Sequence, residues 1–193
     1  MKITILTGSP RRDGNTAYLT ERFAEGAREA GHEVFTFDCA AHKIGPCLAC
    51  GHCGMDGPCV QKDDFDIVRG HIAEADMIVS ATPVYYFGVS AQLKTAIDRF
   101  YSIHRRLGGK KCALIAAFGN PSSRGAEPSV AMYRAMLTYL GWEDMGTLLA
   151  AGVWAKGDVF STDYGRQAYE MGRNNKITAS AYIGGKTMKT GQI

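Results

Sequence analysis

The stretch KITILTGSPRRDGNT, residues 2–16, decides the fold of this chain. Residues 2–7 form a short apolar and β-branched run, which is typical of a buried strand. Gly8 and Gly14 then bracket a polar turn, and the helical pattern of residues 16–30 follows it. A strand, a glycine-bracketed turn and a helix in this order predict the first βα unit of an α/β domain.

The same alternation of apolar runs and helical patterns continues along the chain. Further strands are expected at residues 34–37, 77–81, 111–118 and 147–153, and the last helix at 163–176. The expected helix N-caps and stops are Asp63 or Asp64, Ser90, Gly31 and Gly141. Five apolar runs joined by helices predict a doubly wound parallel sheet with helices on both faces. In such a fold, ligands bind beyond the carboxyl ends of the strands.

Length and composition fit one globular domain. The chain has 193 residues, of which 46% are hydrophobic and 21% charged, close to globular averages. We expect residues 1–183 to form a single domain with a cysteine-rich insertion at about residues 39–62. Residues 184–193 are rich in Gly, Lys and Thr and have no apolar period, so we expect a flexible tail there.

Charge and hydropathy argue against several classes of partner. The net charge is +3, from 22 basic and 19 acidic residues, which is too weak a field to predict nucleic-acid binding. No apolar stretch approaches the roughly 20 residues needed to cross a bilayer, and the first strand is not preceded by a secretory signal. We therefore expect a cytoplasmic protein with no membrane partner. In that reducing compartment, the six cysteines indicate metal ligands or redox groups before disulfides.

The turn after the first strand has the chemistry of an anion site. Ser9, Asn15 and Thr16 supply short polar side chains, and Arg11 supplies a positive charge. The following helix offers free backbone N–H groups and the positive end of its dipole, which together favour a phosphate. The turn matches neither the Walker pattern nor Gly-x-Gly-x-x-Gly. An ordinary polar turn with an N-cap is the alternative.

Two more loops follow strands and reach the same edge of the predicted sheet. The loop TPVYYFG at 82–88 combines Pro, Gly and three consecutive aromatic residues, which together can hold a flat heterocycle. Aromatic residues at a strand end also serve as core or interface packing. The loop at 119–125 begins with Gly119 and Asn120. Both a direct cofactor contact and a plain strand–helix connection are compatible with it.

These loops resemble those of the flavodoxin-like FMN reductase superfamily. The segments that carry the resemblance are GSPRRDGNT at 8–16 and TPVYYFGVSAQLKTAIDRF at 82–100. The resemblance implies a three-layer flavodoxin-like fold with strand order 2-1-3-4-5. It implies a flavin phosphate held by Ser9, Arg11, Asn15 and Thr16, and an isoalloxazine ring lined by Pro83, Val84, Tyr85, Tyr86, Phe87 and Gly88. Gly119 and Asn120 are the expected contacts of the third loop, where the chain departs from the Thr/Ser-Gly-Gly pattern of relatives.

Four cysteines lie in a segment that has no regular apolar period. Cys47, Cys50, Cys53 and Cys59 have the spacing C-x2-C-x2-C-x5-C, a compact arrangement of the kind that binds a [4Fe–4S] cluster. Structural zinc sites usually pair two such units across a longer loop, and here Cys50 would belong to both adjacent pairs. A cluster is favoured over metal-free thiols, and metal-free thiols over zinc.

The cysteine motif also resembles that of the iron–sulfur flavoproteins, a branch of the same superfamily. Members of this branch carry a four-cysteine insertion after the second strand and then a Lys-Asp-Asp stretch, which this chain has at 62–64. The resemblance implies FMN and a [4Fe–4S] cluster as cofactors and a homodimer or higher homo-oligomer as the assembly. It implies a ferredoxin-like electron donor in the iron–sulfur branch and NAD(P)H as co-substrate in the plain reductase branch.

The resulting functional hypothesis is a flavin-dependent oxidoreductase. FMN accepts two electrons as hydride and a [4Fe–4S] cluster exchanges single electrons, so together they connect two-electron and one-electron partners. No catalytic side chain is expected, because the flavin carries the chemistry. The alternatives are a plain NAD(P)H-dependent FMN or quinone reductase without a cluster, a non-enzymatic electron carrier, and a zinc-stabilised binding module.

Overall fold

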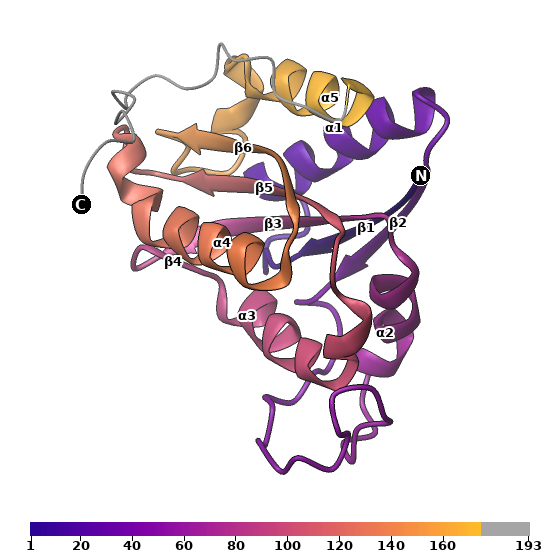
Figure 1. Ribbon diagram of the computed structural model, residues 1–193. Coiled ribbons are helices and arrows are strands. Elements are labelled where there is room, and N and C mark those ends of the chain that lie inside the picture. Colours follow the sequence, from indigo (N-terminus) through magenta and orange to yellow (C-terminus); the bar gives the residue numbers. More distant parts are fainter. Residues whose placement is uncertain (175–193) are drawn as a thin grey trace, which may run out of the picture.

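Five parallel strands form the central sheet of the computed structural model, which describes residues 1–174 (Figure 1). They are β1 (Lys2–Thr7), β2 (Glu33–Asp38), β3 (Met77–Tyr85), β5 (Lys111–Phe118) and β6 (Glu143–Ala151). Their order across the sheet is β2-β1-β3-β5-β6. Counted along the chain, these parallel strands have the predicted flavodoxin-like order. The short strand β4 (Gly88–Val89) pairs antiparallel with the end of β3.

Helices cover both faces of the sheet (Figure 1). Helices α1 (Asn15–Glu29) and α5 (Tyr164–Asn174) lie on one face. The other face carries α2 (Phe65–Glu74), α3 (Ala91–Asp98), the 3-10 helix η1 (Arg99–Arg106) and α4 (Glu127–Leu140). The short 3-10 helices η2 (Ser123–Ala126) and η3 (Asp158–Ser161) lie in the loops that follow β5 and β6.

Each face of the sheet has its own apolar core. Leu19 and Phe23 of α1 are fully buried against β1, β3 and β5, together with Ala168 of α5. Helices α1 and α5 approach closely, since a Cβ on Gly26 would lie 2.1 Å from the carbonyl oxygen of Tyr169. The opposite core holds side chains of α2, α3, η1 and α4. The predicted three-layer α/β/α architecture is therefore confirmed.

The predicted strands differ from the observed ones mainly at their ends. The last strand was expected at 147–153, but β6 begins at Glu143 and ends at Ala151. Among the described strands, β6 pairs only with β5 and is therefore an edge strand, and its first residue, Glu143, is exposed. A search for apolar runs does not find a strand that begins with polar residues. The third strand runs beyond 77–81, through Pro83, to Tyr85.

The expected helix ends are largely confirmed. Ser90 caps α3 by accepting a hydrogen bond from the Leu93 N–H at 3.4 Å. Gly31 and Gly141 both adopt left-handed backbone angles just after helices α1 and α4. Of the two aspartates, Asp64 holds the N-cap position of α2 without a side-chain cap bond.

Several expectations fall at the end of the chain. The helix expected at 163–176 is described as far as Asn174. Its remaining part, the domain limit at residue 183 and the tail at 184–193 lie outside the described residues. Within residues 1–174, no helix is both long and apolar enough to cross a membrane.

Candidate functional site

A pocket opens at the carboxyl edge of the sheet, where the three predicted loops meet. Its volume is about 610 Å³ including its open mouth. The predicted flavin contacts that line it are Ser9, Arg11, Asn15, Thr16, Pro83, Val84, Tyr85 and Gly119. Its other lining residues, which were not among the predicted flavin contacts, are Gly14, Ala117, Phe118, Val153 and Trp154. We call this hollow the flavin pocket.

The first loop of the flavin pocket follows a tight and well-anchored path. The Gly8 N–H donates to the Ala81 carbonyl at 2.8 Å, and the Ser90 hydroxyl donates to the Gly8 carbonyl at 2.7 Å. A Cβ on Gly8 would lie 2.3 Å from the Ser90 Oγ, so this position requires glycine. The Ser9 Oγ lies 3.2 Å from the Arg11 N–H that donates to it. The loop is therefore fixed against β3 and the start of α3.

The N-terminus of α1 lies beside the flavin pocket, and no acidic side chain caps it. Its N-cap is Gly14, which makes no side-chain cap bond, and its first turn holds no acidic residue. Asp13, the acidic residue of the loop, forms an ion pair with Lys156 that lowers the pKa of the Asp13 carboxyl. The free N–H groups and the helix dipole are thus left for an anion, with Arg11 on the same wall.

Asn15 lines the flavin pocket, but its side chain is already engaged. Its Nδ2 donates to the carbonyl oxygens of Val153 at 3.2 Å and Ala155 at 2.8 Å. Its Oδ1 accepts from the N–H groups of Gly157 at 3.0 Å and Val159 at 3.4 Å. The amide thus ties the start of α1 to the loop after β6. This geometry leaves backbone groups, rather than the Asn15 side chain, for a phosphate.

The second predicted loop divides into a pocket wall and a projecting tip. Pro83, Val84 and Tyr85 line the pocket as the end of β3. Tyr86 and Phe87 form the tip of the β3–β4 hairpin, and their φ angles of 47° and 67° are unusual for aromatic residues. Both side chains are exposed, and neither lines the pocket. Gly88, next to them, also lies outside the pocket wall, so the ring contacts expected of these three residues stay predictions.

The third loop contributes Gly119 to the pocket wall. A Cβ on Gly119 would lie 2.3 Å from the Trp154 Cε3, so the indole rests directly on this glycine. Trp154 is 80% exposed although it lines the pocket, and its position after β6 is the signal that could have identified it. Asn120 lies outside the pocket wall, where its Oδ1 accepts from the Ser122 N–H at 2.8 Å. Its expected flavin contact stays a prediction.

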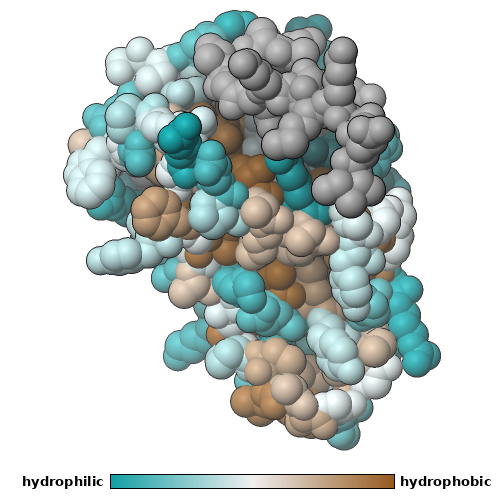
Figure 2. Space-filling model, turned by 60° about the vertical axis from the view of Figure 1, so that its left-hand side comes forward, coloured by the Kyte–Doolittle hydropathy of each residue, from teal (hydrophilic) through white to brown (hydrophobic). Residues whose placement is uncertain are grey.

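The four predicted metal ligands line a second pocket, which shares no lining residue with the flavin pocket. Cys47 and Cys50 are exposed, Cys53 and Cys59 are half-buried, and all four are free thiols. This cysteine pocket has a volume of about 350 Å³ including its open mouth. Figure 2 shows hydrophobic residues at the lowest part of the molecule, where Figure 1 places the loop between β2 and α2.

The loop that carries the cysteines turns repeatedly through left-handed backbone angles. Gly51 and Gly54 have φ angles of 70° and 53°, and the non-glycine residues Ala49 and Met55 have φ angles of 53° and 72°. Such angles are unfavourable for Ala and Met, and they persist only where the surroundings hold the backbone. They bend the chain around the cysteine pocket.

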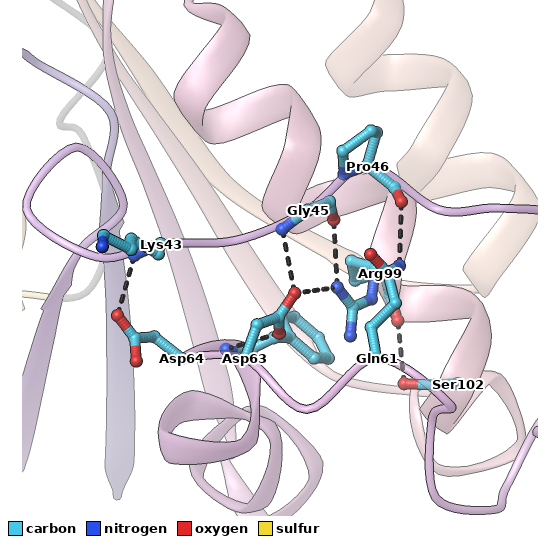
Figure 3. A network of polar contacts seen from close by, with 9 residues as sticks. Lys43, Gly45, Pro46, Gln61, Asp63, Asp64, Arg99 and Ser102 are labelled. Carbon is cyan, nitrogen blue, oxygen red and sulfur yellow. Dashed lines mark hydrogen bonds and ion pairs between the residues drawn. The ribbon is translucent and has the colours of Figure 1, made fainter.

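A polar network fastens this loop to the domain (Figure 3). The Asp63 Oδ2 accepts from the Gly45 N–H at 2.9 Å and from the Arg99 Nη1 at 2.7 Å. Arg99 Nη1 also donates to the Gly45 carbonyl at 2.9 Å. Gln61 Nε2 donates to the Pro46 carbonyl at 2.9 Å. Both ends of the cysteine segment are therefore joined through Asp63 and Arg99.

The Asp63–Arg99 pair is largely withdrawn from water, and the side chain of Arg99 is only 1% exposed. Burial alone would raise the pKa of the Asp63 carboxyl. The hydrogen bonds that it accepts from Arg99, Gly45 and Phe65 outweigh burial, so the pKa is lowered. Burial likewise opposes the charge of Arg99, whose pKa is nevertheless raised, first by Asp63 and then by Cys59. Both groups are thus charged at neutral pH. Sequence analysis missed Arg99, although it lies inside the segment quoted at 82–100.

The remaining two cysteines are buried away from both pockets. Burial raises the pKa of the Cys39 thiol to about 12 and raises that of Cys112 further. They are therefore neutral packing groups. In the described part of the chain, no three Cys, His, Asp or Glu side chains come close enough together to bind a single metal ion.

The family assignment comes from comparison with known proteins. The model of the NADPH-dependent FMN reductase family matches residues 1–156. An iron–sulfur flavoprotein of Archaeoglobus fulgidus is 36% identical over 126 residues, which cover 63% of this chain and 57% of that protein. An iron–sulfur flavoprotein of Methanosarcina thermophila is 36% identical over 124 residues, or 64% of this chain and 65% of that protein. The alignments thus span less than two thirds of these relatives.

Solved structures agree with the fold. An NAD(P)H:quinone oxidoreductase from Methanothermobacter marburgensis superposes with a TM-score of 0.74 at 21% identity, covering 89% of this chain and 94% of that one. The family match covers the first loop, the aromatic hairpin and the cysteine segment, and agrees with the expected class of flavin-dependent oxidoreductase. The chain belongs to the NADPH-dependent FMN reductase family.

Proposed function

We propose that this protein is an FMN-dependent oxidoreductase that also carries a [4Fe–4S] cluster on Cys47, Cys50, Cys53 and Cys59. It passes electrons between a reduced donor and an acceptor through these two centres. The observation that carries the proposal is the coexistence, in one chain of the FMN reductase family, of an uncapped helix N-terminus in a 610 Å³ pocket and four free thiols around another.

The flavin pocket supplies what the phosphate end of FMN requires. The α1 N-terminus offers backbone N–H groups, Ser9 and Thr16 offer hydroxyls, and Arg11 offers a charge that can be aimed at a phosphate. Asn15 holds the start of α1 in place through the loop after β6. We infer that these residues bind and orient the phosphate of FMN.

The same pocket supplies a lining for the flavin ring. Pro83, Val84 and Tyr85 line the pocket at the end of β3, and Gly119 and Trp154 line it at the loops after β5 and β6, which together suit a planar group. When bound, FMN accepts two electrons as hydride and releases them one at a time. NAD(P)H fits the open mouth of the pocket as the donor, in agreement with the description of the family.

The cysteine pocket fits a cluster by its donor set and by its surroundings. The four thiols come from one looped segment, and the buried Arg99 supplies positive charge on the same wall. A bound [4Fe–4S] cluster exchanges single electrons, so it would connect the flavin to a one-electron partner such as ferredoxin. Arg99 and Asp63 hold the two ends of the segment together around this site.

We further propose a homodimer as the assembly. Both aromatic side chains at the tip of the β3–β4 hairpin are exposed, Tyr86 to 102% and Phe87 to 57%. A second copy that covers this tip would remove apolar surface from water. Analytical ultracentrifugation at micromolar concentration should show a dimer, and a monomer would contradict this part of the proposal.

The proposed function is tested by purifying the protein without oxygen. We expect an absorption spectrum with flavin bands and a broad iron–sulfur shoulder, and analysis should give FMN, iron and acid-labile sulfide in the same sample. Flavin bands without iron or sulfide would reduce the function to a plain FMN reductase. Zinc without flavin would favour the binding module instead.

A further inference from the structure

Arg99 is the buried cation whose role the fold alone does not explain. Its Nη1 is fully used, because it donates to the Asp63 carboxylate and to the Gly45 carbonyl. Its Nε and Nη2 are also buried, yet they have no hydrogen-bond partner among the described residues. A buried donor without a partner is unfavourable, because it has lost its hydrogen bonds to water. An orphaned half of a guanidinium therefore needs an acceptor that this structure does not contain.

Arg99 lies at the wall of the cysteine pocket. Arg99 is one of the residues that line this pocket together with the four cysteines, whereas Asp63 is not. Cys59 lies close enough to Arg99 to help raise the pKa of its guanidinium, after the larger effect of Asp63. The ring of Phe65 lies 5.0 Å from the guanidinium carbon and covers it on another side. Asp63 and Phe65 thus occupy part of the surroundings of the guanidinium, and the cysteine pocket adjoins the same side chain.

From this geometry we infer that Arg99 is a charge-compensating residue of the cluster site, whose free N–H groups donate to Cys59 sulfur or to a sulfide of the cluster. The inference rests on the proposed cluster and goes beyond it. One electron added to a cluster breaks no bond and adds one negative charge. Arg99 stabilises the reduced state more than the oxidised state, because hydrogen bonds to sulfur and nearby charge set the reduction potential.

A neighbouring arginine provides a matched control. Arg69 Nη2 donates to the carbonyls of Gly57 at 2.9 Å and Ser102 at 3.2 Å, so it also fastens the cysteine loop. Its Nε is buried and unpartnered as well. Arg69 does not line the cysteine pocket, however. A purely structural role of buried arginines predicts the same effect at both positions, whereas our inference predicts an effect at Arg99 alone.

The experiment is an anaerobic redox titration of the cluster in the full-length holoprotein, with dithionite as the reductant. We expect Arg99→Gln to lower the ratio of reduced to oxidised cluster at least tenfold at a fixed potential, a shift of about 59 mV for one electron. Arg99→Lys should recover most of this shift, because it keeps the charge. Arg69→Gln should leave the midpoint unchanged.

A second variant guards against misfolding. Arg99→Gln leaves Asp63 as a buried charge without its partner, so Arg99→Gln/Asp63→Asn removes both charges together. We expect this double variant to bind FMN like the wild type, which reports an intact flavin pocket, and still to show the lowered midpoint. An unchanged midpoint in both Arg99 variants, or an equal shift in Arg69→Gln, would overturn the inference. Wild-type protein that lacks iron and sulfide would overturn the proposed cluster itself.

Discussion

The flavin pocket and the cysteine pocket are built in different ways, although both lie in loops that follow strands. The flavin pocket is formed by the ends of β1, β3 and β5 and the start of α1, so the sheet itself determines its shape. The cysteine pocket is formed mainly by a segment without helix or strand, packed against residues of η1. Side-chain bonds from Asp63, Arg99 and Gln61 hold this segment in place (Figure 3). The shape of the flavin pocket thus follows from the sheet topology, whereas the shape of the cysteine pocket depends on a few side-chain contacts between residues far apart in the sequence.

The largest expected effect tests whether the two pockets act independently. We expect Cys50→Ser to abolish the cluster, because a hydroxyl is a poor ligand for iron, and to leave FMN binding unchanged. The absence of shared lining residues is the physical reason. Iron, sulfide and FMN are measured in the anaerobically purified variant. Cys39→Ala, which changes a buried cysteine outside the pocket, is the control that should keep all three.

The second prediction concerns the anchor of the cysteine pocket. We expect Asp63→Asn to lower the free energy of unfolding by about 3 kcal/mol at pH 7, because Arg99 is left as an unpaired buried charge. Urea unfolding followed by circular dichroism measures this change. The neighbouring substitution Asp64→Asn, which affects an acceptor for the Lys43 N–H, should cost about 1 kcal/mol. Equal losses at both positions would contradict a special role for the pair.

The pH dependence of this anchor follows from the lowered pKa of Asp63. The ionised carboxylate contributes stability above its unfolded pKa of about 3.9, and this contribution is lost as the pH falls through the lower folded pKa. The difference between wild type and Asp63→Asn should therefore be constant above about pH 5 and shrink below pH 4. Unfolding curves at pH 3 to 7 check this, and a difference that grows on acidification would be inconsistent with the pair.

The same contrast explains what could be predicted from the sequence. The strands, the cap at Ser90 and the first loop follow from local patterns, because apolar runs, a capping serine and glycines mark them. The strand order was predicted from the family resemblance instead. The cysteine spacing is equally local. Arg99 is different, because its role depends on Asp63 and Gly45, which lie far from it in the sequence. No local pattern marks such a contact, and the same holds for Asn15, whose side chain bonds to the loop after β6.

The third prediction weakens the phosphate end of the flavin pocket. Arg11→Ala should raise the dissociation constant of FMN about ten- to hundredfold, since hydrogen bonds to charged groups contribute about 1.5–3 kcal/mol. Flavin fluorescence titration of the apoprotein measures the change. Arg12→Ala is the matched control, because Arg12 is exposed in the same loop but does not line the pocket. A similar loss in both variants would indicate only a long-range charge effect.

The smallest expected effect concerns Trp154, the flavin-pocket residue that sequence patterns missed. Its indole rests on Gly119 and is 80% exposed, so it can contact a bound ring without reorganising the core. Trp154→Ala should weaken FMN binding about two- to tenfold, because an aromatic contact is worth about 0.5–1.5 kcal/mol beyond its buried area. The variant should keep its stability, unlike Asp63→Asn. Phe160→Ala, which removes another exposed aromatic side chain outside the pocket, should bind FMN like the wild type. If Trp154→Ala also leaves the affinity unchanged, the ring is held by the backbone of the sheet edge alone, and the contrast between the two pockets becomes sharper.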